Sequence, residues 1–481
     1  MESNKQKIAG GLFWSYGERI MAQLVSLIVS IVLARLLDPE NYGVISIVMI
    51  FITFCDAIVT GGFGNAIVQK KDADELDVNT MLCCSVATSI LLYIIIFCAA
   101  PYIAAFYNMP IIRPILRVLG LRLLISGVNS IQRAWIQKRL LFKRFFISTS
   151  FGTIISAIVG ISMAYMGMGA WALVGQYLTN SFIDTTVLLI TNDWKPRLQF
   201  SWKRAKSMLS YGWKVLLTTV VYTIEGDLRS LIIGKQFGSA DLAYYDQGKK
   251  FPNLLVTNIN TSISNVMFPV LSESQNDTLR MKQLCRRSIQ ICTYLLAPLL
   301  IGLIAIADNF VSAILTSKWL PCVPYLQILT LVYLVRPLTT TCQQAIMSIG
   351  RSDITLRIMI IVNCTDIILL LVAVFAYKSV LMIAVGALIT EIVSMSLFMK
   401  YTKIFIGYSY KEQLEDILPS LLLAGTMGSF ISIVCNLNWN TWQTLITQIV
   451  FGAGYYIILS NVFHMRPFKY VLQLVLEKIK H

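Results

Sequence analysis

Basic side chains inside long apolar segments are the residues of this sequence best suited to bind an anion. Nine of the forty lysines and arginines occupy such segments. They are Arg19, Arg117, Arg122, Arg133, Lys214, Arg229, Lys249, Lys250 and Arg336. A charge at the centre of a membrane helix costs about 2.5–3.5 kcal/mol on insertion scales, so each needs a partner or a wet surface. Because arginine forks suit phosphate or carboxylate oxygens, an anionic ligand is the chemistry to expect.

Helical spacing places most of these charges on polar stripes. The stripes are Arg19, Gln23, Ser26 and Ser30; Arg122, Ser126, Asn129, Arg133 and Gln137; Lys214, Glu225 and Arg229; Asn258, Thr261 and Asn265; and Arg336, Thr340 and Gln343. A membrane helix keeps such a stripe when it faces a wet cavity or another polar helix. The predicted cavity residues are Arg19, Gln23, Asp56, Asn129, Arg133, Lys214, Arg229, Lys249, Lys250 and Arg336. Among the acids, Asp56, Glu225 and Asp227 could carry a coupling proton or sodium ion.

A second interpretation of the same charges is that they pair within the protein and only hold helices together. It applies most directly to the i, i+4 pair Glu225 and Arg229. It also applies to the isolated acids Asp184, Asp366 and Glu391, which lie inside apolar segments. Arg117 and Arg122 could instead extend toward the membrane surface from the end of their helix.

Composition identifies the elements that carry these residues as membrane helices. The chain has 481 residues, of which 56% are hydrophobic and only 14% charged, with a mean hydropathy of +0.68. Water-soluble domains carry about 25% charged residues, so a soluble protein is excluded. Apolar runs of spanning length predict an all-α integral membrane protein with fourteen transmembrane helices. These runs cover 10–34, 43–68, 78–106, 114–136, 146–167, 170–191, 208–233, 242–270, 288–309, 324–349, 355–376, 379–399, 414–435 and 442–463.

The net charge of +15 is explained by membrane orientation. With the N-terminus in the cytoplasm, twenty-six basic residues fall in cytoplasmic segments and five in outer ones, as the positive-inside rule requires. This split predicts a multi-pass protein of the cytoplasmic (inner) membrane with both termini in the cytoplasm. Since most of the positive charge orients the chain, it does not indicate nucleic-acid binding.

An internal repeat organises the predicted helices. Ser15-Tyr16-Gly17 begins the first span, and Ser210-Tyr211-Gly212 begins the seventh. The two copies are six helices apart, an even number, so the halves share one orientation. The sequence predicts an N-terminal bundle over residues 1–195, a C-terminal bundle over 196–411, and two further helices with a tail over 412–481. Two related bundles whose polar faces meet predict a central basic cavity, and this layout is typical of an alternating-access transporter.

Several kinds of chemistry are not expected from this sequence. The ten cysteines show no CxxC spacing, and both histidines, His464 and His481, lie at the C-terminal end, so no metal site, disulfide or histidine-based catalytic group is predicted. No phosphate-binding GxxxxGK[ST] loop occurs. We therefore expect no enzyme and no cofactor, with a proton or sodium gradient as the energy source. The acidic run Asp72–Asp77 is interpreted as a solvated loop.

Two segments resemble a known family. Ala34-Arg-Leu-Leu-Asp-Pro-Glu-Asn-Tyr-Gly43, followed by Gly61-Gly-Phe-Gly-Asn-Ala-Ile-Val-Gln-Lys-Lys71, is similar to the start of bacterial polysaccharide exporters and lipid-linked oligosaccharide flippases. The stretches 245–252 and 266–272 resemble the eighth helix of the same family. This family belongs to the multidrug/oligosaccharidyl-lipid/polysaccharide transporter superfamily.

The resemblance implies a substrate. It implies that an undecaprenyl-diphosphate-linked oligosaccharide moves to the periplasmic leaflet for assembly of lipopolysaccharide, capsule or exopolysaccharide. Polysaccharide polymerase and glycosyltransferases are expected as partners, and a monomer is expected because the symmetry is internal. Two alternatives stay open: an ion-coupled multidrug exporter of the same superfamily, and a membrane polymerase or ligase.

Overall fold

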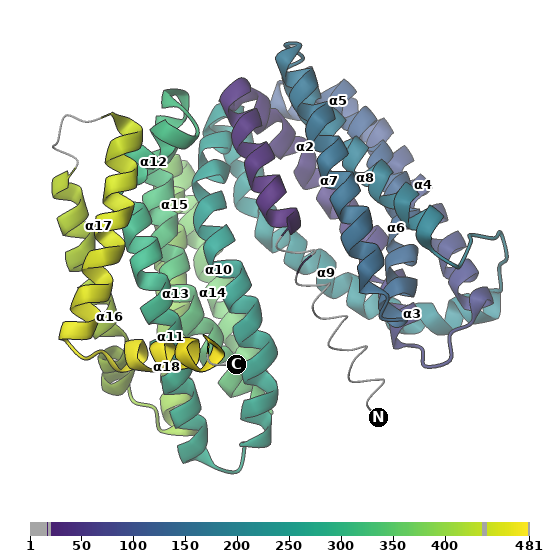
Figure 1. The fold of residues 1–481 in the computed structure, drawn as a ribbon. Coiled ribbons are helices and arrows are strands. Elements are labelled where there is room, and N and C mark those ends of the chain that lie inside the picture. Colours follow the sequence, from purple (N-terminus) through teal and green to yellow (C-terminus); the bar gives the residue numbers. More distant parts are fainter. Residues whose placement is uncertain (1–16, 18–20, 435–439, 480–481) are drawn as a thin grey trace. The chain divides into compact units, whose positions relative to one another are not determined.

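The computed structural model describes residue 17, residues 21–434 and residues 440–479, and its regular elements there are helical (Figure 1). Contacts divide the chain into two compact units, Met1–Ala243 and Tyr244–His481. The first unit holds a helix over Met21–Leu36, then α2 (Pro39–Gly61), α3 (Phe63–Gln69), α4 (Glu75–Tyr107), α5 (Ile112–Leu119), α6 (Leu121–Lys138), α7 (Phe142–Tyr165), α8 (Ala170–Thr191) and α9 (Trp202–Gln236).

The second unit takes in nearly all of α10 (Ser239–Glu273) and the elements that follow it. These are α11 (Thr278–Ala305), α12 (Ala307–Ile314), the short helix η1 (Ser317–Cys322), α13 (Val323–Ser348), α14 (Ser352–Val372), the short helix η2 (Ala373–Tyr377), α15 (Val380–Ile406), α16 (Tyr410–Val434), α17 (Thr441–Val462) and α18 (Arg466–Ile479).

The all-α membrane class is confirmed, and eleven helices in the described ranges are long and apolar enough to span a membrane. Three of the fourteen predicted spans are not among these eleven. The first, 10–34, lies partly outside the described residues and continues as the short helix Met21–Leu36. The other two correspond to α8 and α9, which are helical but more polar. The count of fourteen therefore stays a prediction.

The helix α9 packs with the first unit, against α2, α3 and α4. The sequence places the bundle boundary after residue 195, which would group α9 with the later helices, whereas contacts divide the chain after Ala243. At Gly62 and Gly212 the backbones of the two segments approach closely. A Cβ atom on Gly62 would lie 3.0 Å from the Gly212 carbonyl oxygen, and one on Gly212 would lie 2.9 Å from the Gly62 oxygen. Gly212, the glycine in the second copy of the Ser-Tyr-Gly repeat, thus allows α9 to pack closely against the segment around Gly62.

The start of α4 is held by an ionic cluster. The interpretation of the acidic run as a solvated loop is right for the exposed Asp72, Asp74 and Glu75 but wrong for Asp77, which is buried within α4. Asp74 caps α4 by accepting the Asp77 N–H, and the Asp77 carboxylate accepts the Asp74 N–H in return. Asp77 is fully buried and pairs with Lys70 at 2.6 Å and with Arg204, at the start of α9, at 3.0 Å. Arg204 also contacts Asp74 and lowers the pKa of that carboxyl to about 2. Hydropathy alone could not reveal these partners, because Arg204 is distant in sequence.

A proline interrupts the C-terminal third of α4. Pro101 has no N–H, so the carbonyl of Phe97, four residues earlier, lacks its usual helical donor. Arg117, on α5, supplies one: its Nε lies 3.2 Å from the Phe97 oxygen, and its guanidinium lies 4.1 Å from the centre of the Phe97 ring. An arginine near the membrane therefore satisfies a backbone group that lipid could not.

In the second unit, Asp416 on α16 fixes the beginning of that helix to α11. Arg286 donates to both carboxylate oxygens at 2.7 and 2.8 Å, Gln290 donates at 2.6 Å and the Tyr408 hydroxyl at 2.7 Å. The Asp416 side chain is only 3% exposed. Further along α11, Tyr294 packs against Tyr456 of α17 and donates a hydrogen bond to Ser460 of the same helix at 3.0 Å.

Candidate functional site

The polar stripe of α6 meets a carboxylate of α8 in the first unit. Asn129 donates to Asp184 Oδ2 and to the Thr185 hydroxyl, both at 2.9 Å. Arg133, one turn further, donates to the same Asp184 oxygen at 3.1 Å. The Arg133 side chain stays 41% exposed, and its guanidinium also lies 5.2 Å from the centre of the Phe145 ring. The four-residue spacing of Asn129 and Arg133 puts both on the face that meets α8.

A second arginine pairs with an acid in the second unit. Arg336 on α13 lies 3.7 Å from Glu391 on α15, and Thr339 donates to the other Glu391 oxygen at 3.1 Å. The Arg336 guanidinium lies 4.8 Å from the centre of the Tyr333 ring, and its side chain is 45% exposed. Pro337 follows Arg336 within α13.

Both units therefore contain the same combination of residues. In the predicted order of spans, α6 and α13 are the fourth and tenth, and α8 and α15 are the sixth and twelfth. Each predicted six-span bundle thus pairs an arginine of its fourth span with a carboxylate of its sixth. The two arginines differ in their position along the helix, because Arg133 is in the last third of α6 and Arg336 is near the middle of α13.

These contacts bear directly on the two interpretations of the polar stripes. Asp184 and Glu391 do pair within the protein, as the second interpretation predicts, but their partners are two of the arginines assigned to the cavity. Both arginines keep about two fifths of their side chain exposed, so pairing does not use up their hydrogen-bonding capacity. Sequence analysis identified all four residues but did not match them, because Asp184 and Glu391 belong to helices two places further along the chain.

The remaining residues predicted for the cavity or for ion coupling fall into three groups. Gln23, Asp227, Arg229, Lys249 and Lys250 are half-buried on their helices. Asp56, on α2, has a buried Oδ1 atom that accepts no hydrogen bond from the described residues. Arg19 and the side chains of Lys214 and Glu225 lie outside the described part of the chain. Whether the set lines one cavity stays a prediction, and so do the ion-coupling roles of Asp56, Glu225 and Asp227.

Buried polar atoms without hydrogen-bond partners among the described residues also occur on α6. Arg122 has a buried Nε atom without one, while its Nη1 lies 4.0 Å from the sulfur of Met49. Gln132 is 1% exposed, and its Oε1 atom accepts no hydrogen bond. In the described residues, no group of three or more His, Cys, Asp and Glu side chains is placed to hold a metal ion.

The arrangement of helices matches the fold of two solved membrane proteins. The fold matches the solved structure of a lipid II flippase, MurJ, in an inward closed conformation, with a TM-score of 0.76 at 17% identity over 94% of this chain and 99% of that one. It also matches an inward-facing multidrug resistance transporter of the MATE family, from the MOP superfamily, with a TM-score of 0.62 at 14% identity over 81% of this chain and 96% of that one.

Sequence then identifies the family. Residues 32–324 match the family described as polysaccharide biosynthesis protein, and the chain belongs to this family. It is 23% identical to the lipopolysaccharide biosynthesis protein WzxC of Escherichia coli, over 89% of this chain and 88% of that protein. It is 22% identical to the teichuronic acid biosynthesis protein TuaB of Bacillus subtilis, over 74% of each. A succinoglycan biosynthesis transport protein, ExoT, of Rhizobium meliloti is 22% identical over 62% of this chain and 61% of that one. The resemblance noted in the sequence is thereby confirmed.

Proposed function

We propose that this protein is a flippase that moves an undecaprenyl-diphosphate-linked oligosaccharide from the cytoplasmic to the outer leaflet for assembly of a surface polysaccharide. Membership of the polysaccharide biosynthesis protein family carries the proposal. It is supported by relatives named for lipopolysaccharide, teichuronic acid and succinoglycan biosynthesis, the last a transport protein. The fold shared with transporters agrees with it.

The paired arginines suggest how an anionic substrate could be held. Arg133 and Arg336 each bind one carboxylate of their own unit, which stabilises the positive charge when no substrate is present. A diphosphate could bind to the exposed donors of the same guanidinium groups, because arginine offers five N–H donors and a carboxylate uses one or two. Binding of this kind needs no unpaired charge in the membrane before or after transport. Asp56 is our candidate to carry the coupling proton or sodium ion, because its Oδ1 atom is buried without a donor among the described residues.

The setting follows from the same proposal. The protein acts as a monomer in the bacterial inner membrane, with both termini in the cytoplasm, beside glycosyltransferases and a polysaccharide polymerase. It catalyses no covalent reaction and uses an ion gradient instead of a bound cofactor.

A deletion strain tests the proposal. We expect complete lipid-linked repeats to accumulate on the cytoplasmic face of the inner membrane, and surface polysaccharide to disappear. A variant with both Arg133→Gln and Arg336→Gln should reach the membrane at normal levels but restore little polysaccharide. Arg351→Gln serves as a matched control, because Arg351 pairs with Asp353 two residues away at 2.9 Å and both side chains are exposed.

Three results would contradict parts of the proposal. Full polysaccharide from the double variant would remove the assigned roles of Arg133 and Arg336. Unpolymerised repeats in the outer leaflet of the deletion strain would indicate a polymerase or ligase. Increased drug sensitivity with intact polysaccharide would indicate a multidrug exporter.

A further inference from the structure

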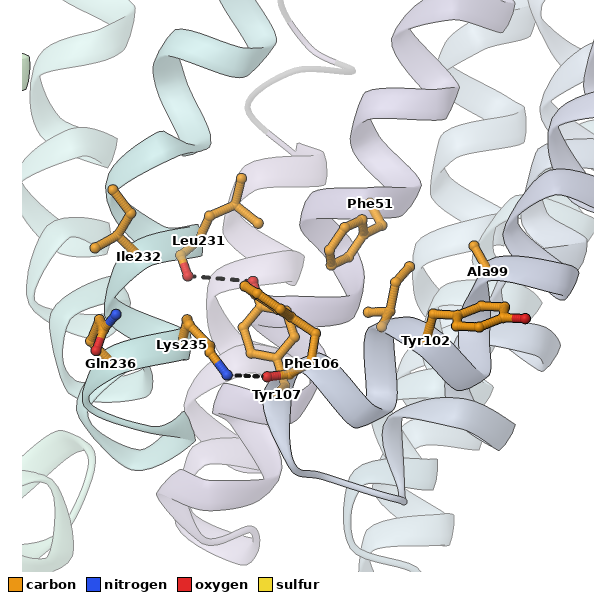
Figure 2. A pocket seen from close by; sticks show the side chains of 10 residues that line it. Phe51, Ala99, Tyr102, Phe106, Tyr107, Leu231, Ile232, Lys235 and Gln236 are labelled. Atoms are coloured by element: carbon orange, nitrogen blue, oxygen red, sulfur yellow. Dashed lines mark hydrogen bonds between the residues drawn. The ribbon is translucent and has the colours of Figure 1, made fainter.

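An apolar pocket lies within the first unit, between α2, α4 and the last turns of α9 (Figure 2). Its volume is about 670 Å³, within the range of about 300–1,000 Å³ found for small-molecule sites. Four aromatic residues line it: Phe51, Tyr102, Phe106 and Tyr107. The Tyr107 hydroxyl donates to the Leu231 carbonyl at 3.3 Å, which ties α4 to α9 at one wall of the pocket.

A single charged side chain, Lys235, is found among the residues that line the pocket. Its ammonium group donates to the Phe106 carbonyl and lies 4.3 Å from the centre of the Phe106 ring (Figure 2). Phe106 is in the last turn of α4, where carbonyl oxygens have no helical donor, so the lysine is fixed at this helix end. An ammonium group has three N–H donors, and the Phe106 oxygen uses one. Lys235 can therefore bind an anion at the pocket without leaving its position.

The pocket adjoins a surface suited to lipid. On α4, the apolar side chains Ile94, Ile95 and Phe97 are exposed. Two residues that line the pocket continue this surface toward the end of the helix, since Tyr102 is 78% and Phe106 55% exposed. By the predicted topology this is the outer end, where aromatic side chains and lysines meet lipid headgroups.

We propose that this pocket binds an anionic phospholipid of the outer leaflet, with one acyl chain among the aromatic residues and the phosphate at Lys235. The occupant is apolar along its length because the lining is apolar apart from Lys235 and Gln236. It carries a phosphate because the fixed cation has free donors and no acid lines the pocket. A phospholipid with one phosphate fits the pocket better than a diphosphate-linked carrier lipid, because the single Lys235 can neutralise one phosphate charge but not the charges of a diphosphate. The pocket lining extends from Ala99 to Tyr107 on α4, only about two helical turns, which is short for a long carrier lipid.

Native mass spectrometry of the full-length purified protein can test the site, with dioleoyl phosphatidylglycerol and dioleoyl phosphatidylcholine as probes. The wild type should retain one phosphatidylglycerol more tightly than phosphatidylcholine. Lys235→Gln keeps a donor for the Phe106 carbonyl but loses the charge, and should weaken phosphatidylglycerol binding about fivefold, since one lysine near an anionic lipid is worth about 1 kcal/mol. Lys235→Arg should preserve the preference.

Pocket-filling variants test the acyl-chain site separately from the charge. Ala99→Phe places a ring in the pocket and should abolish the retained lipid, whereas Ala105→Phe, on an exposed position of α4 outside the lining, should leave it unchanged. If Ala99→Phe fails to fold, Leu231→Phe fills the pocket from α9.

Three outcomes would overturn the proposal. Equal retention of both probes by the wild type and by Lys235→Gln would reduce Lys235 to a cap of α4. Unchanged binding in a folded pocket-filling variant would place the lipid elsewhere. Displacement of phosphatidylglycerol by a lower concentration of undecaprenyl phosphate would assign the pocket to the carrier lipid. The proposal does not depend on the proposed transport function, because it concerns lipid binding alone.

Discussion

Replacing Asp416 by asparagine should destabilise the second unit. The buried carboxylate accepts four hydrogen bonds, from Arg286, Gln290 and Tyr408, at distances of 2.6 to 2.8 Å. Asparagine keeps the shape but removes the charge, and it directs an NH₂ group at donors. Removal of one partner from a fully buried ion pair costs about 3–5 kcal/mol.

Two features of the site make the expected loss of stability smaller than this range. The Arg286 side chain is 32% exposed, so water stabilises its charge after the substitution. Arg286 also lies 3.7 Å from Glu412, which remains as a second partner. We therefore expect a loss of about 2 kcal/mol. For a unit of this size, a loss of about 2 kcal/mol corresponds to a lower midpoint of thermal unfolding by roughly 4–8 °C.

Thermal unfolding of the purified protein in detergent, followed by tryptophan fluorescence, measures this effect. Glu415→Gln is the matched control: it changes an adjacent acid that is 57% exposed and lies 4.0 Å from Lys411, so its effect should stay within about 0.5 kcal/mol. A cycle with Arg286→Gln should give a coupling energy above about 1 kcal/mol. Equal midpoints for Asp416→Asn and Glu415→Gln, or additive effects in the cycle, would refute the reasoning.

Three further outcomes are expected from other contacts. Asp74→Asn should destabilise the first unit by less than about 1 kcal/mol at pH 6, because Asp74 is largely exposed, and the difference from wild type should shrink as pH falls from 4 toward 2. The sign follows because the lowered pKa stabilises the fold only while Asp74 is ionised, and constant destabilisation over this range in thermal unfolding would contradict it. Gly212→Val should lower the yield of folded protein, whereas Gly226→Ala, where an added Cβ meets nothing within 4 Å, should not, as size-exclusion chromatography would reveal. Asp56→Asn should reduce transport in reconstituted vesicles driven by an ion gradient while leaving substrate binding intact, and an unchanged dependence on the gradient would remove Asp56 from the coupling role.

The sequence alone predicted the membrane class and most helix positions, because hydrophobic run length and charge asymmetry follow directly from the physics of the bilayer. It also selected Arg133 and Arg336 as costly charges. The sequence could not show which neighbouring helix each polar stripe faces. The rotation of a helix about its own axis depends on packing, and the hydropathy of the sequence does not record it. The pairing with Asp184 and Glu391 is therefore a property of the fold.

The ionic cluster at the start of α4 shows a second limit. Asp74 and Asp77 occur in a run that is typical of exposed loops, and Asp77 is fully buried because Lys70 and Arg204, the latter from the start of α9, both pair with it. Similarly, the repeated tripeptide did not show that Gly212 of α9 approaches the backbone at Gly62, because this contact depends on where α9 packs in the fold. Long-range contacts decide both cases.

The contact between Arg117 and the Phe97 carbonyl has an evolutionary consequence. Proline at position 101 leaves that carbonyl without a helical donor, and Arg117 supplies it from another helix. The two positions should therefore vary together among relatives. A relative that keeps the proline should keep a long donor at the position of Arg117, and a relative with an ordinary residue in place of the proline should be free to lose it.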